Sequence, residues 1–335
     1  MQTHGTALIL GATGGAGYEI AQALRRHGWQ IRALSRRPEA GRRLMPEADW
    51  VEGDAMVAAD VAEAAVNAQL IVHAVNPPGY RNWRGLALPM LNNTIAAARA
   101  NAARIVFPGT VYNYGPDAFP LLKETSPQRP RTRKGRIRVE MEERLRLASA
   151  QGTRVLIVRA GDFFGPHGTG NSWFSQGLVK PGKPVRAVTD PGRRGVGHAW
   201  AYLPDYGEAV ARLVDKDAAL APFETFHFGG HWFDDGRDFI ERIRIVAGVP
   251  DAPVRRFPWA ALLALSPFVR LFRELAEMKY LWDVPVRLGN AKLVGVLGEE
   301  PHTPVDLAIR SALQGMDCLK AGEIPSVGGK IMLRA

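Results

Sequence analysis

The sequence has one cysteine, Cys318, among its 335 residues. A single cysteine excludes an intrachain disulfide and any cysteine-ligated metal cluster, and it fits a reducing compartment. No basic region precedes the first apolar run, so we expect a core strand there rather than a signal peptide, and a cytoplasmic protein. The histidines lack the spacing of metal ligands, and we assign no metal site.

Long apolar runs are also missing. The most apolar stretch, residues 259–272, is interrupted by a Ser-Pro pair and an arginine and falls short of the ~20 residues that span a bilayer, so we expect no membrane span. We expect one helical face of this stretch to pack in a lobe core, with a subunit contact or a lid over an apolar substrate as alternatives. That face carries Leu262, Leu265, Val269 and Phe272.

Acidic residues are fewer than basic ones, 33 against 43, which gives a formal net charge of +10. The excess favours anionic ligands such as NADP, nucleotide-linked substrates or acyl-CoA, and therefore an anionic small-molecule substrate. Basic residues cluster only between residues 129 and 146, without interleaved aromatic residues or a nucleic-acid motif. We therefore expect no specific binding of nucleic acid.

The most informative stretch is an apolar run, residues 7–10, that leads into a glycine-rich turn and then into a helical pattern. Glycine lets the backbone approach a pyrophosphate, and the free N–H groups at the helix start can hold it. An ordinary glycine-rich turn is the alternative for the glycines alone. The predicted phosphate-binding residues are Gly11, Ala12, Thr13, Gly14, Gly15, Ala16 and Gly17.

A second apolar run, residues 30–34, ends at Ser35, Arg36 and Arg37, where dinucleotide-binding folds contact the adenosine ribose. An NAD site would place a carboxylate there, whereas a guanidinium can bind the 2′-phosphate of NADP. We therefore predict NADP, in preference to NAD, with Arg36 as the main contact. A solvated basic face is the alternative.

Apolar runs and helical segments keep alternating along the chain, which is typical of an α/β doubly wound parallel sheet, a Rossmann fold. Further strands are expected at 49–52, 70–74, 104–107 and 155–158, and helices at 57–68, 86–102 and 134–150. After Gly165 the pattern loosens, which indicates an interleaved, smaller C-terminal substrate lobe. We predict an NADP-binding domain at 1–164 and about 196–230, and the lobe at about 165–195 and 231–320.

Several motifs follow the order of a known family: residues 11–17, then Gly53-Asp54, Ala74-Val75-Asn76, residues 110–115 and residues 159–166. Over nearly its whole length the chain resembles the extended short-chain dehydrogenase/reductase superfamily, of the NAD-dependent epimerase/dehydratase type. The resemblance implies that Thr110 hydrogen-bonds the reacting carbonyl and that helices near 86–102 and 134–150 form a homodimer. It also implies cofactor contacts at Asp54, Ala55, Ala74, Val75, Asn76 and Pro108, and substrate contacts at Asp162, Phe163 and Phe164.

The family's catalytic pair, a tyrosine followed four residues later by a lysine, is missing, because none of the 7 tyrosines has a lysine at that spacing. In such a pair the ammonium lowers the tyrosine pKa so that the phenol can exchange a proton with the substrate. Alignment on a later acid of the helix places Lys134 and Arg138 at the two positions, and we predict that they replace the pair. Two solvated charges are the alternative. Tyr112, Tyr114 and Asp162 are further candidates for proton transfer, with packing or a salt bridge as their alternative roles.

These observations favour an NADP-dependent oxidoreductase or epimerase-like enzyme that acts at a carbonyl or hydroxyl carbon. The second hypothesis is a non-catalytic NADP(H)-responsive binding or regulatory protein, because the catalytic pair is missing. The third is the epimerisation or dehydration of a nucleotide-linked sugar.

Overall fold

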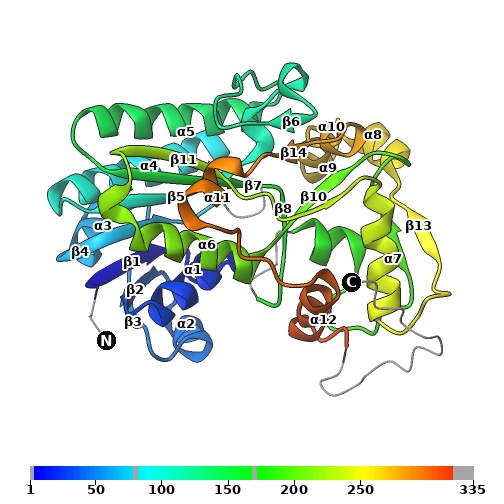
Figure 1. The fold of residues 1–335 in the computed structure, drawn as a ribbon, viewed down its shortest axis with the longest axis horizontal. Coiled ribbons are helices and arrows are strands. Elements are labelled where there is room, and N and C mark those ends of the chain that lie inside the picture. The colour runs from blue at the N-terminus through cyan, green and yellow to red at the C-terminus, as the bar shows by residue number, and fades with distance from the viewer. Residues whose placement is uncertain (1–3, 78–81, 168–171, 320–335) are drawn as a thin grey trace.

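A computed structural model describes residues 4–77, 82–167 and 172–319 of the chain (Figure 1). Its central feature is a seven-stranded sheet in the order β11-β7-β5-β4-β1-β2-β3, in which every pairing is parallel. The strands are β1 (Thr6–Leu10), β2 (Gln30–Ser35), β3 (Asp49–Glu52), β4 (Ala68–His73), β5 (Arg104–Thr110), β7 (Val155–Ala160) and β11 (Phe223–His227). The predicted doubly wound parallel sheet is confirmed.

Helices cover both faces of this sheet (Figure 1). One face carries α1 (Gly15–Arg26) and α6 (Leu203–Asp215), and the other carries α3 (Ala58–Ala64), α4 (Trp83–Ala100) and α5 (Arg133–Ala150), while α2 (Pro38–Leu44) follows β2. Alternate residues of β1 point to opposite faces: Ala7 and Ile9 pack with α1 and α6, and Leu8 and Leu10 pack with the second group. All four are fully buried, so the strand is continuously apolar because it is covered on both sides.

The predicted strands and helices correspond to observed elements, with shifted ends. The helix expected at 57–68 ends at Ala64, and β4 already begins at Ala68. Asn67, between them, has a φ of 60°, a left-handed conformation that does not continue a helix. Local backbone geometry therefore sets this boundary, which periodicity alone placed too late.

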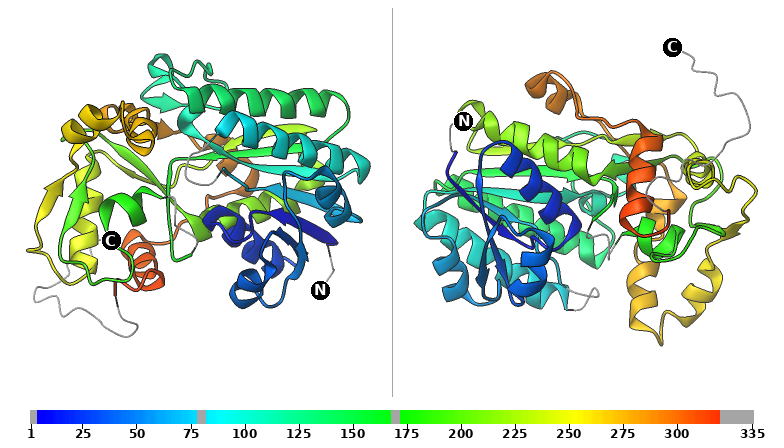
Figure 2. Two further views of the ribbon diagram at one scale, coloured as in Figure 1. Left: turned by 180° about the vertical axis from the view of Figure 1, so that it is seen from behind. Right: turned by 90° about the horizontal axis from the view of Figure 1, so that it is seen from below.

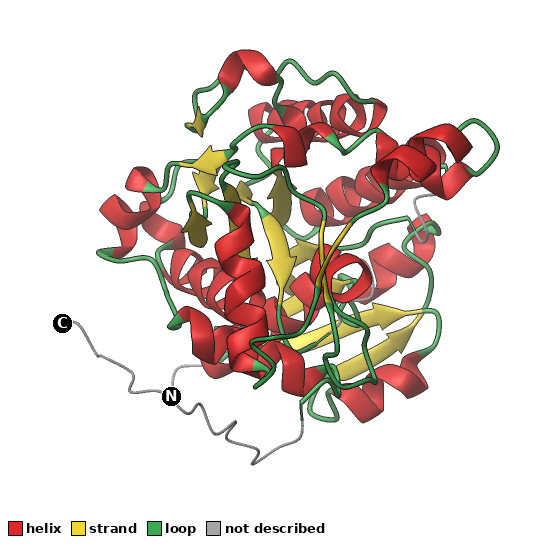
Figure 3. Cartoon of the chain, turned by 90° about the vertical axis from the view of Figure 1, so that its right-hand side faces the viewer, coloured by secondary structure: helices red, strands yellow, loops and turns green. Residues whose placement is uncertain are grey.

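The lobe lies beside the carboxyl ends of the sheet and consists of short strands between helices (Figures 1 and 3). A three-stranded sheet of β8 (Asp162–Phe164), β10 (His198–Tyr202) and β12 (His231–Phe233) packs with helices α7 (Gly236–Val246) and α12 (Val305–Gly315). Smaller elements are β6 (Leu121–Leu122), β9 (Val188–Asp190), β13 (Val254–Arg256), β14 (Arg287–Leu288), α8 (Trp259–Leu265), α9 (Arg270–Ala276), α10 (Tyr280–Asp283) and α11 (Ala291–Leu297), with single turns at Val111–Asn113 and Phe174–Leu178. Where the domain boundaries fall remains a prediction.

The expectation of core packing for residues 259–272 is wrong for Leu265 and Val269. The segment forms two short helices, α8 and α9, because Pro267 lies between them and cannot continue the first. Of the predicted face Leu262 is buried, whereas Leu265 and Val269 are exposed and the neighbouring Phe268 is 84% exposed. Among the described residues no helix is long and apolar enough to cross a bilayer.

Candidate active site

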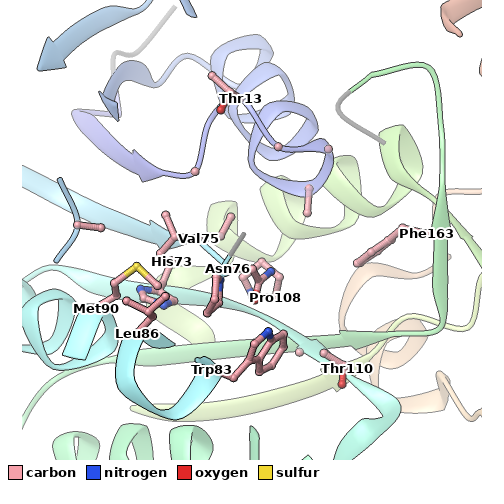
Figure 4. A pocket seen from close by; sticks show the side chains of 18 of the residues that line it. Thr13, His73, Val75, Asn76, Trp83, Leu86, Met90, Pro108, Thr110 and Phe163 are labelled. Carbon is pink, nitrogen blue, oxygen red and sulfur yellow. The ribbon is translucent and has the colours of Figure 1, made fainter. Parts of the chain in front are cut away.

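One large cavity, of about 590 Å³, opens where the parallel strands end. Its lining comes from the ends of β2, β4, β5 and β7, from the turn after β1, and from the start of the lobe. Carboxyl ends of strands are where doubly wound sheets bind their ligands. Figure 4 shows Thr13 on one side of this cavity and Asn76, Thr110 and Phe163 around the rest.

The glycine turn forms the wall next to β1. Gly11 has a φ of 94°, and a Cβ there would lie 2.7 Å from the Ala74 carbonyl oxygen, while a side chain at Gly17 would collide with the Gly11 carbonyl. Gly14 is different, because a Cβ there would meet only the Gly11 oxygen, at 3.4 Å. Gly14 lines the cavity and is the N-cap residue of α1, where it offers no side-chain hydrogen bond to the helix start. Packing inside the protein therefore does not require a glycine at position 14, and the missing side chain leaves space on the cavity side of the turn. That space, beside the start of α1, fits a dinucleotide pyrophosphate.

Ser35, the last residue of β2, and Arg36, which follows it, line the next part of the cavity. With Arg37 they also line an adjoining hollow of about 560 Å³. The Arg36 guanidinium is exposed and lies 4.0 Å from the Asp54 carboxylate, which accepts a hydrogen bond from the Met56 amide at 3.0 Å. This end of the cavity thus offers an accessible positive charge and, beside it, carboxylate acceptors.

Arg138 reaches the opposite part of the cavity from α5. Its Nη2 donates to Asn76 Oδ1 at 2.7 Å and its Nη1 to the Pro108 carbonyl at 3.4 Å. The guanidinium also lies over the rings of Trp83 and Phe107, at 5.2 and 5.4 Å. Arg138 therefore joins the segment that follows β4 to β5 and places a fixed positive charge at the cavity wall, where Ala74 and Val75 also lie.

His73, the last residue of β4, lines the same wall and is buried. Its Nδ1 lies 2.7 Å from Thr94 Oγ1, whose hydroxyl donates to the Met90 carbonyl, so Nδ1 is assigned as the donor. Burial, reinforced by the Arg138 charge, lowers the pKa of His73 to about 3, so the ring is neutral near pH 7. Within the described residues its Nε2 has no hydrogen-bond partner, which leaves a buried acceptor in a residue that lines the cavity.

Lys134 lies one helical turn before Arg138 and is placed differently. Its ammonium donates to the Glu274 carbonyl at 2.9 Å and pairs with the Glu274 carboxylate at 3.0 Å, and Lys134 is not among the described residues that line the cavity. Burial lowers its pKa, and Glu274 acts in the opposite direction. The structure therefore brings Arg138, and not Lys134, to the cavity.

Of the two candidate tyrosines, Tyr112 lines the cavity and Tyr114 is not among the described residues that line it. Tyr112 is partly buried and lines the cavity next to Thr110, whose Oγ1 accepts the Tyr112 amide at 2.9 Å. Tyr114 is fully buried: its hydroxyl accepts from Arg159 at 2.8 Å and lies 3.0 Å from His227 Nε2. Burial raises the pKa of Tyr114. Tyr112 is therefore the phenol available to a ligand in the cavity.

Asp162 and Phe163 line the lobe side of the cavity, whereas Phe164 is fully buried in the lobe core. Asp162 Oδ2 lies 2.8 Å from Nε2 of His198. The His198 ring in turn stacks on Trp282, at 4.0 Å between centroids and 4° between planes. Asp162 is thus a cavity carboxylate held by an oriented imidazole.

Several residues that line the cavity or contact its lining were not predicted from the sequence. His73 precedes the predicted Ala74–Asn76 segment directly, so its position at a strand end was a usable signal. His198 lies 36 residues from Asp162, and no local pattern joins them. Trp173 lines the cavity and packs with Phe257, at 5.5 Å between ring centroids, again far along the chain. Among the described residues no cluster of metal-binding side chains is present.

A protein-family model described as the NAD dependent epimerase/dehydratase family matches residues 7–229. No curated protein matches the chain.

Solved structures with the same fold have low sequence identity. A UDP-galactose 4-epimerase is 17% identical with a TM-score of 0.67, over 93% of this chain and 98% of that chain. A putative epimerase from Burkholderia cenocepacia J2315 is 18% identical with a TM-score of 0.72, over 95% and 99%. The Bordetella bronchiseptica enzyme WbmH, solved in complex with NAD+, is 19% identical with a TM-score of 0.67, over 93% and 97%. At these identities the similarity shows the fold.

Proposed function

The chain belongs to the NAD-dependent epimerase/dehydratase family, and from this premise we propose that it is an NADP-dependent oxidoreductase or epimerase-like enzyme. The reacting carbon bears a carbonyl or a hydroxyl. One observation carries the proposal: a single cavity is lined by the phosphate-binding turn, by Arg36, and by Thr110 and Asp162. The same cavity therefore offers polar groups for both a dinucleotide and a second, smaller ligand.

NADP is the proposed cofactor, and when bound its nicotinamide supplies or accepts a hydride. Arg36 would bind the 2′-phosphate, since its guanidinium is exposed beside the hollow next to the turn. The turn at residues 11–17 would hold the pyrophosphate. Asn76 and Arg138, already hydrogen-bonded to each other, would position the other end of the dinucleotide.

We assign the proton chemistry to residues that line the cavity. Thr110 would donate a hydrogen bond to the reacting oxygen. Asp162 would take the proton of a substrate hydroxyl, or return it in the opposite direction, while His198 orients the carboxylate. Tyr112 is the alternative proton carrier. Lys134 has a structural role in this proposal, because Glu274 holds its ammonium.

The lobe, residues 165–195 and 231–320, would select the substrate. Its contribution to the lining includes Trp173, and Asp162 lines the same cavity. A carboxylate repels a second anion. This arrangement favours a substrate without a negative charge at the reacting carbon, and the anionic substrate that the overall charge suggested stays a prediction.

A non-catalytic NADP(H)-responsive binding protein is the second candidate. It is favoured by the engagement of Lys134 with Glu274, because the position aligned with the family's tyrosine then has no access to the cavity. Cofactor binding without any turnover would distinguish this candidate from the enzyme.

Calorimetric titration with NADPH and NADH tests the cofactor assignment. Wild type should prefer NADPH, and Arg36→Ala should lose that preference. Arg42→Ala is the matched control, since Arg42 is an exposed arginine on the neighbouring α2, paired with Glu39. A panel of aldehydes, ketones and alcohols then tests turnover. If neither NADPH nor NADH bound to the protein, the proposal would be overturned.

A further inference from the structure

The hairpin of α8 and α9 has a surface unlike that of the rest of the lobe. It projects from the body of the molecule in the right-hand view of Figure 2. Its tip exposes large apolar side chains, with Phe268 the most exposed. The tip residues are Leu263, Leu265, Phe268, Val269 and Leu271. A contiguous apolar surface of this kind marks a site of interaction.

The charged residues from Arg255 to Arg273 are all basic. Residues 252–273 include four arginines and no aspartate or glutamate. Arg255, Arg256 and Arg273 are exposed, and the first two belong to β13, which directly precedes the hairpin. The surface therefore combines an apolar tip with a cationic base, and it is complementary to a surface that is apolar inside and anionic outside.

Both ends of the hairpin are fixed to the body. At the start of α8, Trp259 Nε1 donates to the Pro191 carbonyl at 2.7 Å. Near the end of α9, Glu274 pairs with Lys134 at 3.0 Å and with Arg133 at 3.4 Å. The buried ion pair between Glu274 and Lys134 thus holds the hairpin in place. The exposed tip therefore belongs to a segment that is fixed at both of its ends.

We propose that the hairpin docks the protein on an anionic lipid bilayer. The apolar tip enters the boundary between headgroups and acyl chains, and the arginines contact lipid phosphates. The protein lies on the membrane and does not span it. This inference is independent of the cofactor and of the reaction.

A second copy of the chain fits this surface less well. The tip comprises residues 263–271, whereas a stable protein interface takes about 20–30 residues a side. Two such hairpins would also bring arginines against arginines, which repel each other. A bilayer has neither restriction, because it accepts a small apolar tip and attracts the cationic base.

Flotation of the full chain with vesicles tests the proposal. Wild type should float with vesicles of phosphatidylcholine and phosphatidylglycerol, and less with phosphatidylcholine alone. In the double variant Phe268→Ser/Leu271→Ser the fraction of protein bound to vesicles should fall at least about tenfold. The reason is that two large apolar side chains are no longer available to move from water into the bilayer. Arg255→Gln/Arg256→Gln should reduce the difference between the two vesicle types.

Leu147→Ser/Leu307→Ser is the matched control, since both leucines are exposed on other elements, α5 and α12. It should float like wild type. Thermal unfolding of each variant, expected to match wild type, verifies the fold. The proposal is overturned if wild type does not float with anionic vesicles, or if the tip variant floats as well as wild type. It is also overturned if light scattering shows a dimer that the tip substitutions dissociate while no vesicle binding is found.

Discussion

The two ends of the cavity are built from different parts of the chain. The cofactor end is mostly backbone: the turn at residues 11–17 and the segments that follow β2 and β4. The substrate end is made by side chains from separate segments, with Asp162 on β8, its partner His198 on β10, and Trp173 at the start of the lobe. Backbone geometry suits any dinucleotide, whereas side chains can change without altering the fold. In the proposed function the first end would bind the cofactor common to the family, and the second would determine the reaction.

Asp162→Asn should give the largest effect and should be confined to the substrate end. The amide keeps the shape but cannot take a proton, so kcat should fall about 100- to 1000-fold with any substrate found in the carbonyl and alcohol panel. The affinity for NADPH should stay within about twofold, because Asp162 lies outside the proposed cofactor contacts. Steady-state kinetics and calorimetry measure the two effects, and an unchanged kcat would remove Asp162 from the mechanism.

Gly14→Val should give the next largest effect, at the cofactor end. Its backbone is extended, with φ −90° and ψ 156°, and a Cβ there meets only the Gly11 oxygen at 3.4 Å, so the protein should fold. The new side chain occupies the proposed phosphate space, and NADPH should bind about 100-fold more weakly, which is about 2.7 kcal/mol.

Gly17→Ala is the comparison variant for Gly14→Val. Its Cβ collides with the Gly11 carbonyl, and therefore it should lower the melting temperature more than Gly14→Val does. If Gly14→Val bound NADPH with wild-type affinity, the phosphate would have to lie elsewhere.

Arg36→Ala should reduce NADPH affinity about 10- to 30-fold and leave NADH affinity nearly unchanged. One charge-assisted contact to a phosphate is worth about 1.5–3 kcal/mol, and the exposure of this guanidinium favours the lower part of that range. Calorimetry at increasing salt should show a smaller loss, because an exposed charge is screened. Equal losses for both nucleotides would instead indicate a general contact, and NADP specificity would then be unsupported.

The sequence predicted the fold, and the residues that line the cavity beside the glycine turn, better than the lining near the lobe, for physical reasons. Strand burial and the glycine turn are local patterns, so periodicity and spacing identified β1, α1 and the turn. Whether Tyr112 or Tyr114 faces the cavity depends on the turn of the chain after β5, which no periodic pattern records. His198 reaches Asp162 only through the pairing of β8 with β10. The hairpin was misjudged because Pro267 divides one apparent helical face into two.

The pH dependence of stability provides a test at the cofactor end. Burial holds the pKa of His73 at about 3, while an unfolded histidine takes up a proton near pH ~6.5. Below that pH the unfolded state binds more protons, so stability is complete above about 6.5 and is lost as the pH falls toward 3. The loss from this group is about 1.4 kcal/mol per pH unit, a factor of ten in the folding equilibrium.

His73→Asn should remove that contribution, and urea unfolding between about pH 5 and 7 would show a shallower slope. A residual slope should remain, because His227 and His231 are also buried, with pKa values lowered to about 3 and about 4. An identical slope in the variant would mean that His73 is accessible to protons in the folded protein.

Lys134→Met should have the smallest effect on the cavity, although it lies one helical turn from Arg138. NADPH affinity and kcat should change less than about threefold, whereas the free energy of unfolding should fall by about 3 kcal/mol, because Glu274 loses its buried partner. Arg138→Met is the matched comparison, and it should weaken NADPH binding because Arg138 holds Asn76 at the cavity wall. If Lys134→Met instead abolished turnover at unchanged stability and NADPH affinity, the lysine would move the proton. The assignment of a structural role to Lys134 and of the cavity contact to Arg138 alone would then be wrong.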